Sequence, residues 1–239
     1  MGEREMAAAT VAAASRLTCR FQDRGSERGF LVSRHAQLRS SAVFFSCIAI
    51  LVLSIAIAFM WAMRENATVR FVRSVMLTIL VLMYLAAAVS LKCQRLLPIL
   101  GPVQVELLSA ALTDLSLLVM TISTPSYLVL ILGLDVPTDC LDELSHMIWL
   151  HCFVSATHIA LPIRWVVLWH SELVAFLCFI VPAMARGRMS WPQILGNVLI
   201  LTGLLLASSL GKRTVEGHER RALTQMLAEK TKRVEMEHS

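Results

Sequence analysis

Three ionisable side chains inside apolar segments are the residues of this sequence best suited to carry chemistry. Asp114 interrupts the apolar segment 107–132, and His151 and His158 lie seven residues apart in segment 144–163, so the two histidines share one face of a helix. A carboxylate in a membrane span is destabilising and normally faces the interior of a bundle. These residues define a candidate intramembrane polar site, an ion or proton relay. The alternative is that Asp114 only hydrogen-bonds within its own or a neighbouring helix.

Histidine and cysteine are poorly placed for a cofactor or a metal. His158 and His170 flank the short connection 161–165, whereas haem in a helix bundle needs a histidine pair at matching depth on two helices. The six cysteines are scattered, and no CxxC pair occurs among them. We therefore expect no cofactor, no zinc site and no structural disulfide.

Three arginines, Arg64, Arg70 and Arg73, cluster between the first two apolar segments. Guanidinium groups at this depth can bind lipid phosphates; the alternative is a solvated loop whose long side chains extend to the membrane interface. The sequence has no arginine series typical of a voltage sensor and no potassium-filter motif. It also lacks a phosphate-binding glycine-rich loop and any other catalytic motif, so we expect no enzymatic activity.

The distribution of charge indicates what kind of element holds these side chains. The first 40 residues hold 7 of the 22 Lys and Arg, the last 29 hold another 7, and the 170 residues between hold 8. With 56% hydrophobic residues, 16% charged residues and a mean hydropathy of +0.67, the chain has the composition of a membrane protein. The net charge of +5 suits an anionic membrane face, and no basic groove with interleaved aromatic residues indicates nucleic-acid binding.

Six apolar segments are each close to the length of a membrane-spanning helix. They are 41–63, 71–91, 107–132, 144–163, 165–185 and 193–210. About 20 helical residues cross a hydrocarbon core of about 30 Å, and the alternating pattern of a membrane barrel is absent. The sequence therefore predicts an all-α, multi-pass membrane helix bundle of about six spans, which together form the domain 41–210. Only Arg164 separates the fourth and fifth segments, which leaves open whether these two are separate.

Both ends of the chain are predicted on the cytosolic side. Residues 1–40 are expected to form a basic, largely disordered tail, and the Lys and Arg near the span ends favour an inside N-terminus. Six spans return the C-terminus to the same side. The loop 133–143 holds four carboxylates and no basic residue, which suits the outside. The sequence 66–68 matches a glycosylation sequon, but it lies so close to the bilayer that we expect it to be unmodified.

The last segment, 211–239, is rich in charged helix formers. Gly211 marks the end of the sixth span, at a position where a helix can stop or bend. Glu216 and Arg220, four residues apart, are predicted to pair on a helix surface. The apolar residues of this segment at helical spacing are Leu223, Met226, Leu227 and Val234. Such an amphipathic helix either lies on the lipid surface or dimerises and transmits movement to a partner.

A charged stretch directly after six apolar segments gives the chain a resemblance to known proteins. The Gly-Lys-Arg at 211–213 and the sequence ERRALTQMLAEKTKRVE at 219–235 resemble the membrane half of multidomain signalling proteins from protists. In these, a six-helix anchor feeds a charged helix and then a cyclase, kinase or similar output domain. The resemblance covers the architecture and about 30 residues of tail. It implies that this chain is the sensor and anchor half, because neither the metal-binding aspartates of a cyclase nor the phospho-acceptor box of a kinase occurs in it.

We therefore expect a membrane sensor or anchor module that couples a helix bundle to a cytosolic signalling helix. Its expected partners are the lipid bilayer and a second copy of the chain, through the C-terminal helix. The alternative function is a channel or transporter for protons or small ions that uses Asp114 and the intramembrane histidines. The sequence leaves open the ligand or transported species, the oligomeric state, the membrane that holds the chain, and whether Ser239 is its natural end.

Overall fold

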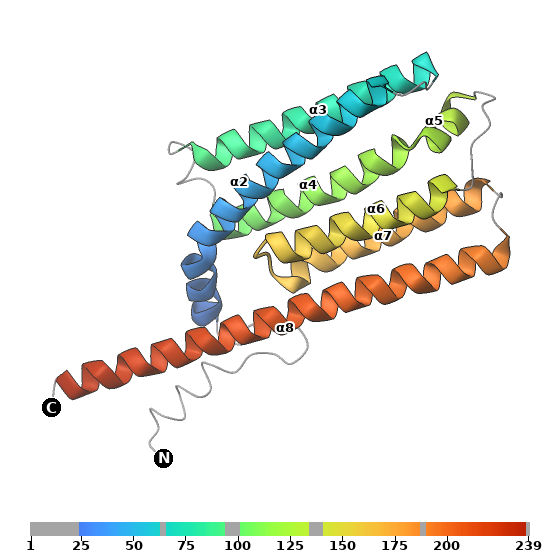
Figure 1. The fold of residues 1–239 in the computed structure, drawn as a ribbon. Coiled ribbons are helices and arrows are strands. Elements are labelled where there is room, and N and C mark those ends of the chain that lie inside the picture. Colours follow the sequence, from blue (N-terminus) through green and yellow to red (C-terminus); the bar gives the residue numbers. More distant parts are fainter. Residues whose placement is uncertain (1–23, 63–65, 94–100, 134–140, 187–189, 238–239) are drawn as a thin grey trace.

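The computed structural model describes residues 24–62, 66–93, 101–133, 141–186 and 190–237, and every regular element among them is a helix. The helices are α2 (Arg24–Ala62), α3 (Ala67–Lys92), α4 (Pro102–Ile122), α5 (Pro125–Leu132), α6 (Leu141–Ala160), α7 (Trp165–Arg186) and α8 (Trp191–Glu237). They form one elongated bundle, in which the long helices run side by side (Figure 1). The expected all-α helix bundle is confirmed.

Five of these helices are long and apolar enough to cross a membrane: α2, α3, α4, α7 and α8. This composition identifies the chain as a membrane protein, as expected. Helix α6, with 20 residues, corresponds to the fourth segment of the six-span prediction. It is a separate helix from α7, because the four residues 161–164 between them are not helical.

Local sequence signals set several helix ends. Asn66 caps α3, since its side-chain oxygen accepts a hydrogen bond from the backbone N–H of Thr68 at 2.9 Å. Pro102 occupies the first turn of α4, where its missing N–H is harmless. The third apolar segment was predicted as one span, but it forms two helices, α4 and α5. The break falls at Ser123 and Thr124, directly before Pro125, which cannot continue the hydrogen-bond ladder.

Two helices are longer at the charged ends of the chain than the sequence indicated. Helix α2 starts at Arg24, so residues 24–40, which we expected to be largely disordered, are helical. Helix α8 runs without interruption through Gly211, where a stop or bend was expected. A glycine inside a helix destabilises it by about 1 kcal/mol relative to alanine, and tertiary contacts on both sides of Gly211, described below, outweigh that preference.

Helix α4 lies at the centre and joins two halves of the bundle (Figure 1). In one half, α2 packs against α3 and α4, with Leu53, Leu80 and Leu112 in the shared core. In the other half, α4, α6, α7 and α8 surround a second core that contains Leu117, Val154 and Leu201. Helix α2 packs mainly against α3 and α4, and it meets α6 through Phe45 and Phe153, whose ring centroids lie 6.1 Å apart.

Hydroxyl side chains inside the bundle are satisfied locally. Several donate to the carbonyl oxygen one turn earlier in their own helix: Ser46 to Ala42, Thr113 to Ser109, Thr121 to Leu117 and Thr157 to Phe153. This pattern lets Ser and Thr lie in apolar helices without a partner from another element. Charged side chains inside the bundle need partners from other elements instead, because a carbonyl oxygen of their own helix does not neutralise a charge.

Candidate functional site

Charged side chains from four parts of the chain meet at one end of the bundle. They form the charge cluster, which comprises Glu27, Glu106, Arg164, Lys212, Glu216 and Arg220. Their elements are the first turn of α2, the N-terminal part of α4, the α6–α7 connection, and the part of α8 that follows its apolar residues. All are buried except Glu27, whose side chain is 14% exposed. Buried charges must be paired and hydrogen-bonded to be tolerated, which makes the geometry of this cluster decisive.

Arg164 joins the α6–α7 connection to α4 and α2. Its Nη2 lies 2.7 Å and its Nε 2.8 Å from Oε2 of Glu106, and its backbone N–H donates to the other oxygen of the same carboxylate. Its Nη1 lies 3.3 Å from Oε1 of Glu27. The planar guanidinium therefore reaches two carboxylates on two helices, an arrangement that a lysine could not reproduce.

Arg220 makes the corresponding bridge from α8. It donates from Nε and Nη2 to Oε1 of Glu216, at 3.0 and 2.8 Å, and from both Nη atoms to Glu27. Its guanidinium also lies 4.2 Å from the ring centroid of Phe30 on α2. The predicted pairing of Glu216 with Arg220 along one helix is confirmed, but both residues are buried between helices rather than exposed.

Two residues one turn apart on α8 cap the ends of the helical hairpin α6–α7. Nζ of Lys212 donates to the carbonyl oxygens of Leu161 at 2.6 Å and His158 at 3.1 Å, at the C-terminal end of α6. Oε2 of Glu216 accepts the backbone N–H of Trp165 at 2.7 Å, at the N-terminal end of α7. A cation at a helix C-terminus and an anion at an N-terminus each satisfy unpaired backbone groups and complement the helix dipole. Helix α8 thus holds the turn of this hairpin.

The predicted intramembrane polar site is divided between two interfaces. Asp114 lies on α4 next to Ser171 and His170 of α7, and its Oδ1 is buried with no hydrogen-bond partner in the described part of the chain. His151 and His158 lie on α6, and no interaction among the described residues connects either of them to Asp114.

The two histidines have different surroundings. His151 lies within 3.5 Å of Ser155, whose Oγ is 3.0 Å from Oγ of Ser208 on α8. His158 is buried, with Nδ1 2.8 Å from the carbonyl oxygen of Val154 and Nε2 2.8 Å from Oε1 of Glu172 on α7. A neutral imidazole has one N–H, so His158 in that form can donate in only one of these two contacts. Within the described residues, no three His, Cys, Asp or Glu side chains gather closely enough to hold a metal ion.

The arginines proposed to contact lipid phosphates lie at the opposite end of the bundle from the charge cluster. Arg64 falls outside the described residues. Arg70 stacks on Trp61, with the guanidinium carbon 4.8 Å from the ring centroid. Arg73 lines a cavity between α2, α4 and α6 that also contains His146. These contacts leave lipid binding by Arg70 and Arg73 as a prediction.

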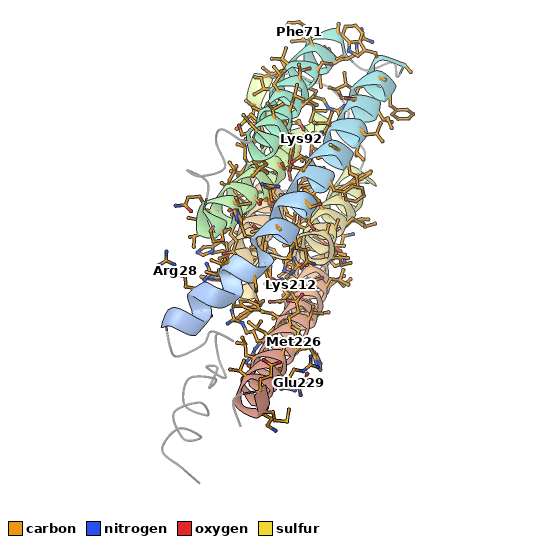
Figure 2. The ribbon with its side chains drawn as sticks, turned by 90° about the vertical axis from the view of Figure 1, so that its left-hand side faces the viewer. Arg28, Phe71, Lys92, Lys212, Met226 and Glu229 are labelled. Carbon is orange, nitrogen blue, oxygen red and sulfur yellow. The ribbon has the colours of Figure 1, made fainter. Side chains whose placement is uncertain are left out.

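The candidate transmitter face lies on the part of α8 beyond the charge cluster. Leu223 is half-buried, whereas Met226, Leu227 and Val234 are exposed. Figure 2 shows Met226 and Glu229 at the end of α8 beyond Lys212, opposite to Phe71 at the far end of the bundle. The tail therefore extends away from the bundle as a rigid continuation of the last apolar helix.

Sequence reasoning missed the charge cluster, although a signal for it was present. Glu106 directly precedes the third apolar segment. Arg164 lies between the fourth and the fifth segment, and Lys212 and Glu216 follow the sixth. In a six-span topology all these positions fall on the same side, so opposite charges on that side could have been paired. Comparison of the chain with protein-family models, with curated proteins and with solved structures gave no match.

Proposed function

We propose that this chain is a membrane-embedded signalling module, in which α8 carries rearrangements of the bundle to a cytosolic helix. The observation that carries the proposal is the continuity of α8 from Trp191 to Glu237. A single helix transmits rotation or translation along its whole length, and a segment that bends at Gly211 would not. The apolar and charged parts of α8 therefore act as one rigid element.

The charge cluster supports the same proposal, because it ties α8 to the rest of the bundle at the point where the tail emerges. Glu216 and Lys212 hold the α6–α7 turn, and Arg220 holds α2 through Glu27. Any displacement of α2, α4 or the α6–α7 turn changes these contacts and therefore shifts the position of α8 that the contacts favour. Interfaces of this kind have discrete alternative packings, so small shifts become defined states.

The side of the membrane is part of the proposal. The first turn of α2 and the tail of α8 lie at the same end of the bundle (Figure 1). This end is rich in basic residues: Arg28, Arg34, Arg39, Arg213 and Arg221. An excess of Lys and Arg favours the cytosolic side, so both described ends of the chain are proposed to be cytosolic.

Self-association through the tail tests the proposal. Two populations of the chain, labelled with donor and acceptor fluorophores at the C-terminal residue of each full-length, truncated or substituted version, are reconstituted together in liposomes, and energy transfer is measured. We expect transfer to fall when the chain is cut after Ala222, which keeps the charge cluster intact, and when Met226 is changed to Glu. The matched control is Gln225→Glu, which adds the same charge at the neighbouring exposed position. Unchanged transfer after the cut would count against a transmitter role.

Proton transport is a second candidate, favoured by the His158–Glu172 pair and by the unpartnered oxygen of Asp114. A buried pair that shares a proton is a typical relay in membrane transporters. The test is proton flux into liposomes that carry the full chain, with Asp114→Asn and Glu172→Gln as variants. Flux that is lost in these variants and kept in His218→Gln, an exposed histidine on the tail, would favour this candidate over signalling.

A further inference from the structure

A cavity of about 730 Å³ opens between α2, α6 and α8, beside the charge cluster. Its walls include Ser41 of α2, His151 and Ser155 of α6, and Ser208 and Gly211 of α8. Two features of the packing create it. Helix α2 packs mainly against α3 and α4, and the face of α8 toward the gap carries small side chains. The cavity is open to the outside of the bundle beside Ile159, an apolar residue of its wall that is 86% exposed.

Lys212 gives this cavity a positive charge. Its residue is 8% exposed, and Nζ uses two of its three N–H groups on the carbonyl oxygens of His158 and Leu161. No described carboxylate forms an ion pair with it, and Glu219, the acidic residue in the cavity wall, is paired with Arg34 at 2.9 Å. A buried ammonium group with a remaining N–H and no direct counter-ion favours an anion in the cavity. The hydroxyls of Ser155 and Ser208, 3.0 Å apart, and the imidazole of His151 add further donors.

A second, apolar groove lies further along the same face of α2. Ser41 is followed at helical spacing by Phe45, Ile48 and Val52, which line a second cavity of about 240 Å³. Trp149 and Phe153 of α6 form its opposite wall. Phe45 and Phe153, whose ring centroids lie 6.1 Å apart, are both in the wall of this second cavity.

We infer that this site binds one anionic phospholipid, with its phosphate on Lys212 and one acyl chain in the groove between α2 and α6. The charge of Lys212, the polar lining and the apolar groove further along α2 match the order of groups in such a lipid. The inference deepens the proposed function and rests on it in one respect, namely that the occupied cavity fixes the position of α8.

Binding is measured by native mass spectrometry of the full chain with phosphatidylglycerol, and in parallel with phosphatidylcholine of the same acyl chains. We expect tighter binding of phosphatidylglycerol. Gly211→Leu should weaken it about tenfold, because the added side chain fills the cavity and removes charge-assisted hydrogen bonds. The matched control is Gly203→Leu, two turns away on α8 and outside the cavity wall. A Cβ at either glycine meets no atom within 4 Å, so the two variants are matched in the space that the first side-chain carbon finds.

Lys212→Met is the second variant, and it should remove the preference for phosphatidylglycerol over phosphatidylcholine. Unchanged phosphatidylglycerol binding in Gly211→Leu, or equal binding of the two lipids by the wild-type chain, would overturn the inference. Competition by inorganic phosphate at equal concentration would overturn it too, because the groove would then contribute nothing.

The two proposals fail separately. If Gly211→Leu weakens phosphatidylglycerol binding but the lipid does not alter energy transfer between tails, the lipid site is supported and its coupling to α8 is contradicted. If the tail variants alter energy transfer and Gly211→Leu leaves lipid binding unchanged, the transmitter role of α8 is supported and the lipid site is contradicted.

Discussion

Arg220 on the C-terminal helix and Glu27 in the first turn of α2 are 193 positions apart in the chain, and they form a part-buried ion pair with two hydrogen bonds. The contact closes the bundle, because it connects its first and last described helices. Close backbone packing does not link α2 and α8; long side chains do. The pair therefore decides how firmly the tail is fixed to the membrane domain.

Breaking this pair is expected to destabilise the protein strongly. Arg220→Met removes a cation from the buried carboxylate of Glu216 and from the part-buried one of Glu27, and one-sided removal of a buried partner costs about 3–5 kcal/mol. The measurement is the unfolding midpoint in a mixed-detergent titration followed by circular dichroism. Arg221→Met, at the next and exposed position, should leave the midpoint unchanged. Equal effects of the two variants would show that the pair contributes nothing beyond surface charge.

Lys212 is expected to control the end of α6. Without its ammonium group, the carbonyl oxygens of His158 and Leu161 lose their donor, which costs about 1–3 kcal/mol for the buried groups. Hydrogen–deuterium exchange should therefore increase in the last turn of α6 in Lys212→Met. Lys232→Met, on the exposed part of the same helix, serves as control. Exchange that rises only in the tail would contradict the capping role.

Tyr84 and Ser116 join α3 to α4 with a buried hydrogen bond of 2.7 Å. Ser116 donates its own proton to the carbonyl oxygen of Leu112, so Tyr84 must be the donor between the two. Ser116→Ala then leaves a buried hydroxyl without its acceptor and should cost about 1–3 kcal/mol, whereas Tyr84→Phe should cost about 1 kcal/mol. Thermal unfolding in detergent measures the order of the two effects. The reverse order would contradict this donor assignment.

Asn66 is expected to act as a helix cap. Asn66→Ala removes the bond to the N–H of Thr68 and should destabilise the start of α3 by about 1 kcal/mol, whereas Asn66→Asp keeps an acceptor and should not. The same residue begins the glycosylation sequon, so the mass of the intact protein from glycosylating cells gives a second measurement. We expect no glycan on Asn66, and a glycan there would contradict both the capping role and the expected position near the bilayer.

The structural features that depend only on residues close together in the chain, such as the apolar helices, were predictable from the sequence. A stretch such as 41–63, without charge, forms a membrane helix wherever it lies, because length and hydropathy suffice. The break between α4 and α5 lies directly before Pro125, which by itself favours a helix boundary. The length of the apolar run around this proline predicts one span instead. At Gly211 the sequence predicts a helix end, but α8 continues through this residue. The contacts of Lys212 and Glu216 with the α6–α7 turn stabilise the continuous helix by more than the local preference of glycine opposes it.

The sequence by itself determined that this chain is a bundle of membrane helices with a charged helical end, because periodicity and apolar length are local properties. Only the tertiary structure decided which charges meet. Glu106, Arg164 and Arg220 are unremarkable in the sequence, and each becomes a buried partner of another helix through the order in which the helices pack. Ion pairs depend on distances of a few ångströms between segments far apart in the chain, and no local pattern encodes such distances.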